Sequence, residues 1–243
     1  MPALRFPSLI VPNVDGRAGD LDRATCLIEE INAVTDATGT YLVSSGALYL
    51  AASRGDAAAA SMLTTATVRD AVLRGEGIGV AVAEHTNALL NNSLGRYREA
   101  AALAQRPMEH PDHLGVSALA TVEFIEAAAR SGMTEMAADA VHRLTALTRA
   151  GATDWARGIE ARSRALVSDG DAAEQLYCEA IERLGRPRLR VELARAHLVF
   201  GEWLRRERRR NDARPIAHRP RHARSHGCGG FRRTSPPRVA CRR

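Results

Sequence analysis

The chain has 243 residues and a formal net charge of +6, a length that suits one large domain or two small ones. Apolar residues make up 45% of it but aromatic residues only 4%, and alanine, the strongest helix former, fills much of the difference. The sequence contains no run of 18 apolar residues and no signal-peptide pattern, so we expect neither a membrane span nor secretion. Its cysteines show neither metal-ligand nor disulfide spacing, which indicates isolated thiols in a cytoplasmic protein. They are Cys26, Cys178, Cys228 and Cys241.

The positive charge is concentrated at the C-terminus. Residues 215–243 contain eight arginines and no acid, whereas residues 1–214 contain 26 arginines against all 28 acids. The chain has no lysine, which we attribute to a GC-rich coding sequence. This division predicts a nearly neutral folded part followed by a disordered, basic tail over 215–243.

A glycine-containing turn recurs along the chain. It stands in AGDLDRA (18–24), RGDAAAA (54–60), LGRYREA (94–100), SGMTEMA (131–137) and DGDAAEQ (169–175), with glycines at 19, 55, 95, 132 and 170. A sixth copy, ERRRNDA (207–213), has Arg208 in the glycine position. Glycine suits these positions because a helix that ends there needs a left-handed residue. The spacing of 36 to 40 residues therefore indicates a structural repeat.

Each repeat unit holds two helices separated by a second turn. The second turns are ATGT (37–40), GEGIG (75–79), HPDHLG (110–115), RAGAT (149–153) and GRPR (185–188). Between the turns the apolar residues recur at helical spacing, as in Met136, Ala140, Leu144 and Leu147. We therefore predict an all-α fold, an α-solenoid of about five TPR-like helix pairs of roughly 38 residues. The irregular N-terminal segment covers 1–17 and the repeat domain covers 18–214.

No catalytic motif is present. A phosphate-binding loop ending in Gly-Lys is impossible without lysine, and His110 and His113 lack a third metal ligand nearby. We therefore predict no catalytic residue, no cofactor and no metal, and a protein that is not an enzyme. Glu123 and Glu126 share a helix face at i and i+3. Two interpretations remain open for them: a groove that binds a ligand or partner, or a polar helix face.

Several ordered segments resemble one known family. They are GEGIGVAVAEHTNALLNNSLGRYREAAALAQ (75–105), VEFIEAAARSGMTEMAADAVHRL (122–144), TDWARGIEARSRALVSDGDAAEQLYCEAIERLG (153–185) and RVELARAHLVFGEWLRRERRRNDAR (190–214). Together they resemble the helical-repeat region of large LuxR-family transcriptional regulators, the MalT-like members. Members of that family have an ATP-binding module before the repeats and a DNA-binding helix-turn-helix after them. The resemblance implies that this chain corresponds to the repeat region, which senses an inducer or partner.

Both ends of the chain depart from that family pattern. No position matches the ATPase or helix-turn-helix motifs, so no residue of those modules is carried over. Reading the tail codons from the second base permits TAHDMLDHMGAEAFAERARRELRAA, which fits the missing family helix. We therefore interpret residues 215–243 as translated out of frame. Sequencing of the locus should show that a single-base change near codon 214 restores the frame that encodes the family helix.

The leading hypothesis is a non-catalytic sensor and signal-relay fragment of such a regulator, or a remnant of its gene. It would bind a protein or small-molecule inducer in the repeat groove, without specific nucleic-acid binding or membrane attachment, and could self-associate through its exposed repeat ends. The alternative is a free-standing TPR-like scaffold for protein interaction.

Overall fold

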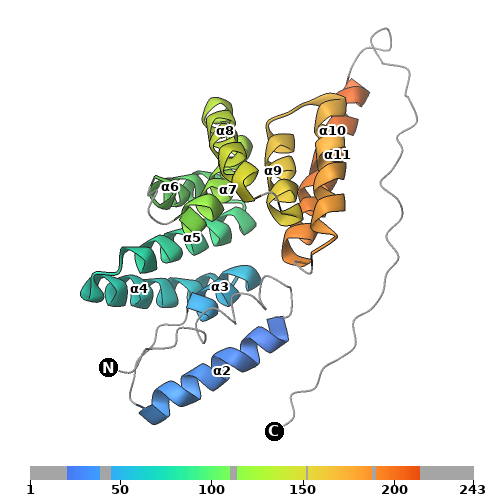
Figure 1. Ribbon diagram of the computed structural model, residues 1–243. Coiled ribbons are helices and arrows are strands. Elements are labelled where there is room, and N and C mark those ends of the chain that lie inside the picture. The colour runs from blue at the N-terminus through green and yellow to red at the C-terminus, as the bar shows by residue number, and fades with distance from the viewer. Residues whose placement is uncertain (1–20, 39–44, 110–113, 152, 188–189, 214–243) are drawn as a thin grey trace.

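The structure is a computed structural model that describes residues 21–38, 45–109, 114–151, 153–187 and 190–213 (Figure 1). Within these ranges it contains ten α-helices and no strand, which confirms the all-α prediction. The predicted segment 1–17 and the tail 215–243 lie outside the described residues. The helices are α2 (Leu21–Thr38), α3 (Ser45–Arg54), α4 (Ala57–Arg74), α5 (Gly77–Ser93), α6 (Tyr97–Met108), α7 (Leu114–Arg130), α8 (Thr134–Gly151), α9 (Asp154–Leu166), α10 (Gly170–Leu184) and α11 (Arg190–Ala213).

The predicted glycine turns form at four described positions. Gly55, Gly95 and Gly132 connect successive helices with φ of +72°, +74° and +83°, and Gly170 opens α10 with φ of +58°. Side chains other than glycine rarely adopt this left-handed conformation. After the first of these turns, the side chain of Asp56 accepts a hydrogen bond of 3.0 Å from the backbone N–H of Ala59. The sequence therefore located these helix boundaries correctly, while Gly19 lies outside the described residues.

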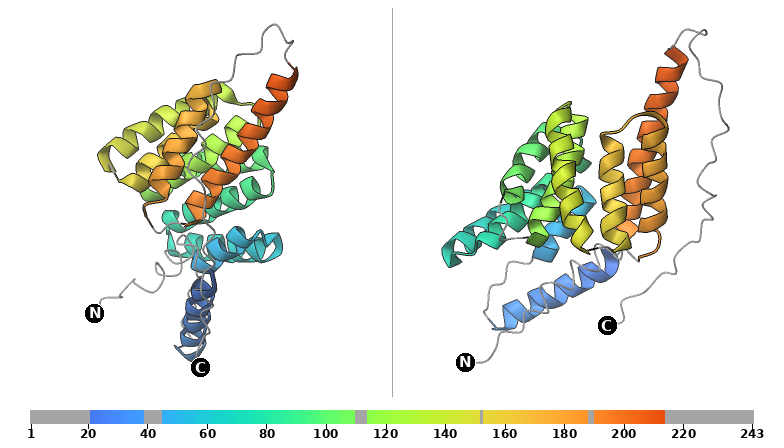
Figure 2. Two further views of the ribbon diagram at one scale, coloured as in Figure 1. Left: turned by 90° about the vertical axis from the view of Figure 1, so that its right-hand side faces the viewer. Right: turned by 45° about the horizontal axis from the view of Figure 1, so that its top comes forward.

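The helices pack as a two-layer array. The odd-numbered helices α3, α5, α7 and α9 form a row in which each packs against the next. Each even-numbered helix from α4 to α10 packs against the odd-numbered helices before and after it in sequence. Helix α2 packs against α3, and Figure 2 shows α9, α10 and α11 grouped side by side at the opposite end of the chain.

Alanine dominates the interior of this array. More than half of the buried apolar residues are alanine, which lets neighbouring helices approach closely. The largest cluster joins helices from α5 to α11 and includes the buried Phe124 and Ile125. In the apolar stripe predicted on α8, Ala140 and Leu144 are buried, but Met136 and Leu147 are 45% and 39% exposed. The centre of that stripe therefore packs inward, and its ends lie at the surface.

The sixth turn does not form. Helix α11 continues without interruption from Arg190 to Ala213, through the ERRRNDA segment at 207–213 (Figure 2). The sequence prediction of a turn at Arg208 is therefore wrong. The physical reason is local, because arginine favours a helix and does not readily take the left-handed conformation that glycine supplies at the other turns.

The cysteines also differ from expectation. Cys26 and Cys178 are both disulfide-bonded, so the prediction of isolated thiols is wrong for these two. Sequence spacing detects metal sites and local bridges, whereas a disulfide depends on which segments fold together. The cytoplasmic location was inferred in part from isolated thiols, and this part of the inference no longer holds. The location itself stays a prediction. None of the described helices has the length and apolarity that crossing a membrane requires.

Candidate functional site

Glu123 and Glu126 are buried on α7 and point toward a helix that is distant in sequence. They are only 4% and 5% exposed. Arg195 of α11 donates to both Glu123 carboxylate oxygens at 2.7 and 2.6 Å and to Glu126 at 2.8 Å. One guanidinium thus holds two carboxylates 72 and 69 residues away, in the paired geometry that makes arginine–carboxylate contacts strong.

A second arginine extends this connection between α7 and α11. Arg130 of α7 lies 3.2 Å from Glu126 and 2.6 Å from Glu202 of α11. It also donates to the hydroxyl of Tyr97 at 3.0 Å, with its guanidinium carbon 5.1 Å from the centre of that ring. Arg195 and Arg130 therefore connect α11 to α7 at two positions along α11, Arg195 and Glu202.

Two further contacts bring α9 and α5 into the same polar cluster. Arg162 of α9, 1% exposed, donates to the Glu192 carboxylate of α11 at 2.7 Å. The side-chain amide of Asn92 of α5 donates to the backbone carbonyl and the carboxylate of Glu123, each at 2.9 Å. The cluster thus joins four helices, and we call it the Arg195 network. Its members are Asn92, Glu123, Glu126, Arg130, Arg162, Glu192, Arg195 and Glu202.

The charges of the network stabilise one another. Burial alone would raise the pKa of Glu123, but the nearby Arg195, the hydrogen bonds that it donates, His85 and Asn92 outweigh burial and hold that pKa at about 2. Burial likewise opposes the shift at Glu192, where attraction to Arg162 lowers the pKa. Glu123 is therefore ionised at neutral pH, and its carboxylate is bound by Arg195 and Asn92.

This coupling predicts an acid-sensitive stability. The pKa of Glu123 in the folded state lies below its ordinary value of 4.5, so its stabilisation is fully present above about pH 4.5 and is lost as pH falls toward about 2. We expect this residue to account for a loss on the order of 3 kcal/mol in the free energy of unfolding. Denaturant titrations across this pH range should show a smaller loss for Glu123→Gln than for the unmodified chain. Equal pH dependence of the two proteins would contradict this assignment.

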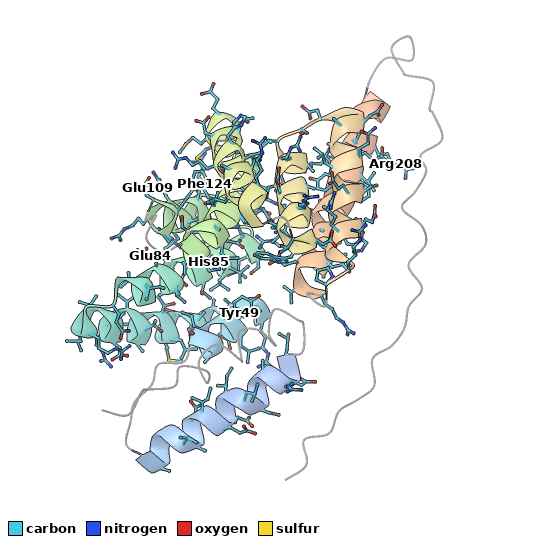
Figure 3. The ribbon with its side chains drawn as sticks, viewed as in Figure 1. Tyr49, Glu84, His85, Glu109, Phe124 and Arg208 are labelled. Carbon is cyan, nitrogen blue, oxygen red and sulfur yellow. The ribbon has the colours of Figure 1, made fainter. Side chains whose placement is uncertain are left out.

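A small cavity of about 40 Å³ lies beside the network. It is lined by residues from all five odd-numbered helices from α3 to α11: Tyr49, His85, Leu89, Leu119, Val122, Glu123, Ile159, Val191, Glu192 and Arg195. Tyr49 and His85 are labelled in Figure 3 on the adjacent helices α3 and α5. The volume suits a water molecule, whereas pockets for small-molecule ligands measure roughly 300–1,000 Å³. A larger ligand could enter here only if the lining helices moved apart.

The structure gives the two sequence-predicted site residues different positions. Glu123 lines the cavity, whereas Glu126 lies beside it and contacts the two arginines. The polar face that they form on α7 is buried and bound by Arg195 instead of facing solvent, while the ligand groove stays a prediction. His110 and His113 lie outside the described residues. In the part of the chain that the structure describes, no group of three or more His, Cys, Asp or Glu side chains could hold a metal ion.

Sequence reasoning missed Arg195, Arg162 and Glu192. A weak signal was present, because VELARAHLVF (191–200) and GIEARSRAL (158–166) place charges inside apolar helical stretches. Long side chains at such positions pair with one another when buried. The sequence could not indicate which acid pairs with which base.

Comparisons with known proteins identify no relative. No protein-family model, no curated protein and no solved structure matches the chain.

Proposed function

We propose that this chain is a non-catalytic helical-repeat sensor, built as an α-solenoid of TPR-like pairs, of the kind found in LuxR-family, MalT-like transcriptional regulators. Two observations support the repeat architecture. Glycine turns separate α3 from α4, α5 from α6, α7 from α8 and α9 from α10, and the odd-numbered helices from α3 to α9 each pack against the next. Such arrays offer an extended inner surface on which a partner or inducer is recognised.

The chemistry of the Arg195 network favours binding over catalysis. A general acid or base needs a pKa near the working pH and a free path to the substrate. Glu123 has a pKa of about 2 and is fully engaged by Arg195 and Asn92, so it is poorly suited to either role. The same groups serve well as a polar contact that a ligand can exploit or displace.

The observation that carries the proposal is the contact of Arg195 with Glu123 and Glu126 beside the cavity. This contact joins α11 to α7 across the space that the odd-numbered helices line. A ligand that enters between them must compete with the Arg195 network or bind to it. Ligand binding would therefore be coupled to the position of α9–α11 relative to α3–α8, which is what a sensor requires.

A thermal-shift screen of metabolites and peptides tests the proposed site. Compounds that raise the melting temperature of the unmodified chain should be retested on Glu123→Gln and on Glu99→Gln, a matched change at an exposed acid of α6. We expect the stabilisation to persist in Glu99→Gln and to be lost in Glu123→Gln. Compounds that stabilise all three proteins equally would contradict binding at this site.

The family proposal has its own test in the coding DNA. Reading about a kilobase on each side of the gene should reveal segments for an ATP-binding module and a helix-turn-helix. Unrelated intact genes on both sides would count against the LuxR proposal without affecting the proposed binding site.

Exposed apolar side chains favour the second candidate, a free-standing protein-interaction scaffold. At the turn between α4 and α5, Val72, Leu73 and Ile78 are 65%, 80% and 50% exposed. Exposed apolar side chains grouped at one turn can mark a protein contact. A specific partner whose binding is lost in Leu73→Asp and retained in Glu123→Gln would favour the scaffold over the sensor.

A further inference from the structure

The outer face of α11 is basic and partly apolar. Ala196, Val199 and Trp203 are buried on the inner side of the helix. On the opposite side Leu198 is 58% exposed and Leu204 is 43% exposed. Between them lies Gly201, where an added Cβ would meet no atom within 4 Å. This face therefore offers two apolar side chains around a point where another helix can approach closely.

The charge of this face is positive because two of the acids on α11 point inward. Glu192 pairs with Arg162, and Glu202 pairs with Arg130. Arg205 and Arg208 are exposed on this side, and Figure 3 shows Arg208 directed away from the helical body. A partner for this face should therefore carry acids next to small or apolar residues.

The helix at the other end of the array has that character. Helix α2 contains four acids (Asp22, Glu29, Glu30 and Asp36) against one arginine, a net charge of −3. Its buried Ala24 and Ile28 pack with Leu50 of α3. Glu29, Glu30 and Ala33 are exposed, and Val34 is 62% exposed. The outer side of α2 thus combines acids with small and apolar side chains.

We propose that the outer face of α11 docks on the outer face of α2 of a second copy of this chain. Because the two faces differ, each copy presents one of each, and the contact repeats head to tail instead of closing as a two-fold dimer. A contact between two single helices is smaller than the 1,200–2,000 Å² or so typical of stable complexes, so the association is weak. It also weakens as salt increases, because its charges are exposed. This inference rests on the terminal helices and not on the function proposed above.

Sedimentation velocity of charge-reversed full-length chains tests this contact. The C-end variant carries Arg205→Glu and Arg208→Glu, and the N-end variant carries Glu29→Arg and Glu30→Arg. The unmodified chain should exceed its monomer mass of 26.2 kDa increasingly with concentration at low salt. Each variant alone should stay monomeric, because both of its docking faces then carry like charge. An equimolar mixture should regain the association, because each face again meets its opposite.

The mixture keeps the test independent of misfolding, since unfolded variants would not restore association when combined. A control with Arg96→Glu and Arg98→Glu at the N-terminal end of α6, both exposed, should associate like the unmodified chain. Association of the C-end variant at the unmodified level would overturn the proposal and place the contact elsewhere, the arginines of 215–243 included. A monomeric unmodified chain, or a mixture that stays monomeric, would overturn it as well. None of these results bears on ligand binding beside Glu123.

Discussion

Replacing Arg195 with methionine is expected to lower the free energy of unfolding by about 3–5 kcal/mol. The substitution preserves much of the side-chain volume but removes the guanidinium that contacts two buried carboxylates. Glu123 and Glu126 would then be left as buried negative charges, and removing one member of a buried ion pair costs more than the pair itself contributes. Denaturant unfolding followed by circular dichroism measures the change.

The same substitution at an exposed ion pair provides the control. Arg106 lies 3.0 Å from Glu84, but its side chain is 75% exposed. Exposed pairs of this kind contribute roughly 0–1 kcal/mol, so Arg106→Met should change stability little. Combining Arg195→Met with Glu123→Leu and Glu126→Leu should recover a large part of the loss, because no buried charge then remains unpaired. Equal effects of Arg195→Met and Arg106→Met would show that the Arg195 network does not stabilise the fold.

Replacing Gly158 with valine should be similarly damaging, for a steric reason. A Cβ added at Gly158 of α9 would lie 2.7 Å from Cγ and 3.0 Å from Cδ2 of Leu184 of α10. Leu184 is fully buried. Forcing additional atoms into such a contact costs about 1–3 kcal/mol or more, because the helices must separate. Thermal unfolding of Gly158→Val should therefore begin at a lower temperature, while Gly158→Ala should show a smaller shift in the same direction.

Gly201 offers the matched control within a helix. It lies inside α11, and an added Cβ there meets nothing within 4 Å. Gly201→Ala should therefore stabilise the protein by roughly 0.5–1 kcal/mol, since alanine restricts the unfolded chain and favours the helix. If Gly158→Ala stabilised the protein as much as Gly201→Ala, close packing between α9 and α10 would not be the reason for glycine at 158.

The helix boundaries were readable from sequence because the signals that set them are local. A left-handed glycine, a capping aspartate such as Asp56 and helical spacing of apolar residues all act within a few positions. The same reasoning failed at Arg208, where the repeat pattern suggested a turn but the residue that makes the turn was absent. Repeat position alone is therefore a weaker guide than the conformational requirement that produced the pattern.

The polar interior shows where local reasoning ends. The i and i+3 spacing placed Glu123 and Glu126 on one face of one helix, which the structure confirms. Their partner, Arg195, is 72 and 69 residues away, and the chain contains 34 arginines that could occupy that place. The pairing depends on the angle at which α11 returns to α7, and packing sets this angle. The periodicity of the sequence therefore predicts the helix face on which a buried charge lies, but it does not identify the residue that pairs with that charge.

The distance in sequence between Arg195 and Glu123 also bears on how the chain folds and opens. Neighbouring helices meet across short turns, so each pair can form early from local contacts. The contact between α11 and α7 closes a loop of about 70 residues. The chain loses the entropy of that loop before the ion pairs can stabilise the fold. We therefore expect α10–α11 to form early and dock late. Once α11 has docked, we expect its segment from Arg195 to Glu202 to fray little, with amide protons that exchange nearly as slowly as those of α7.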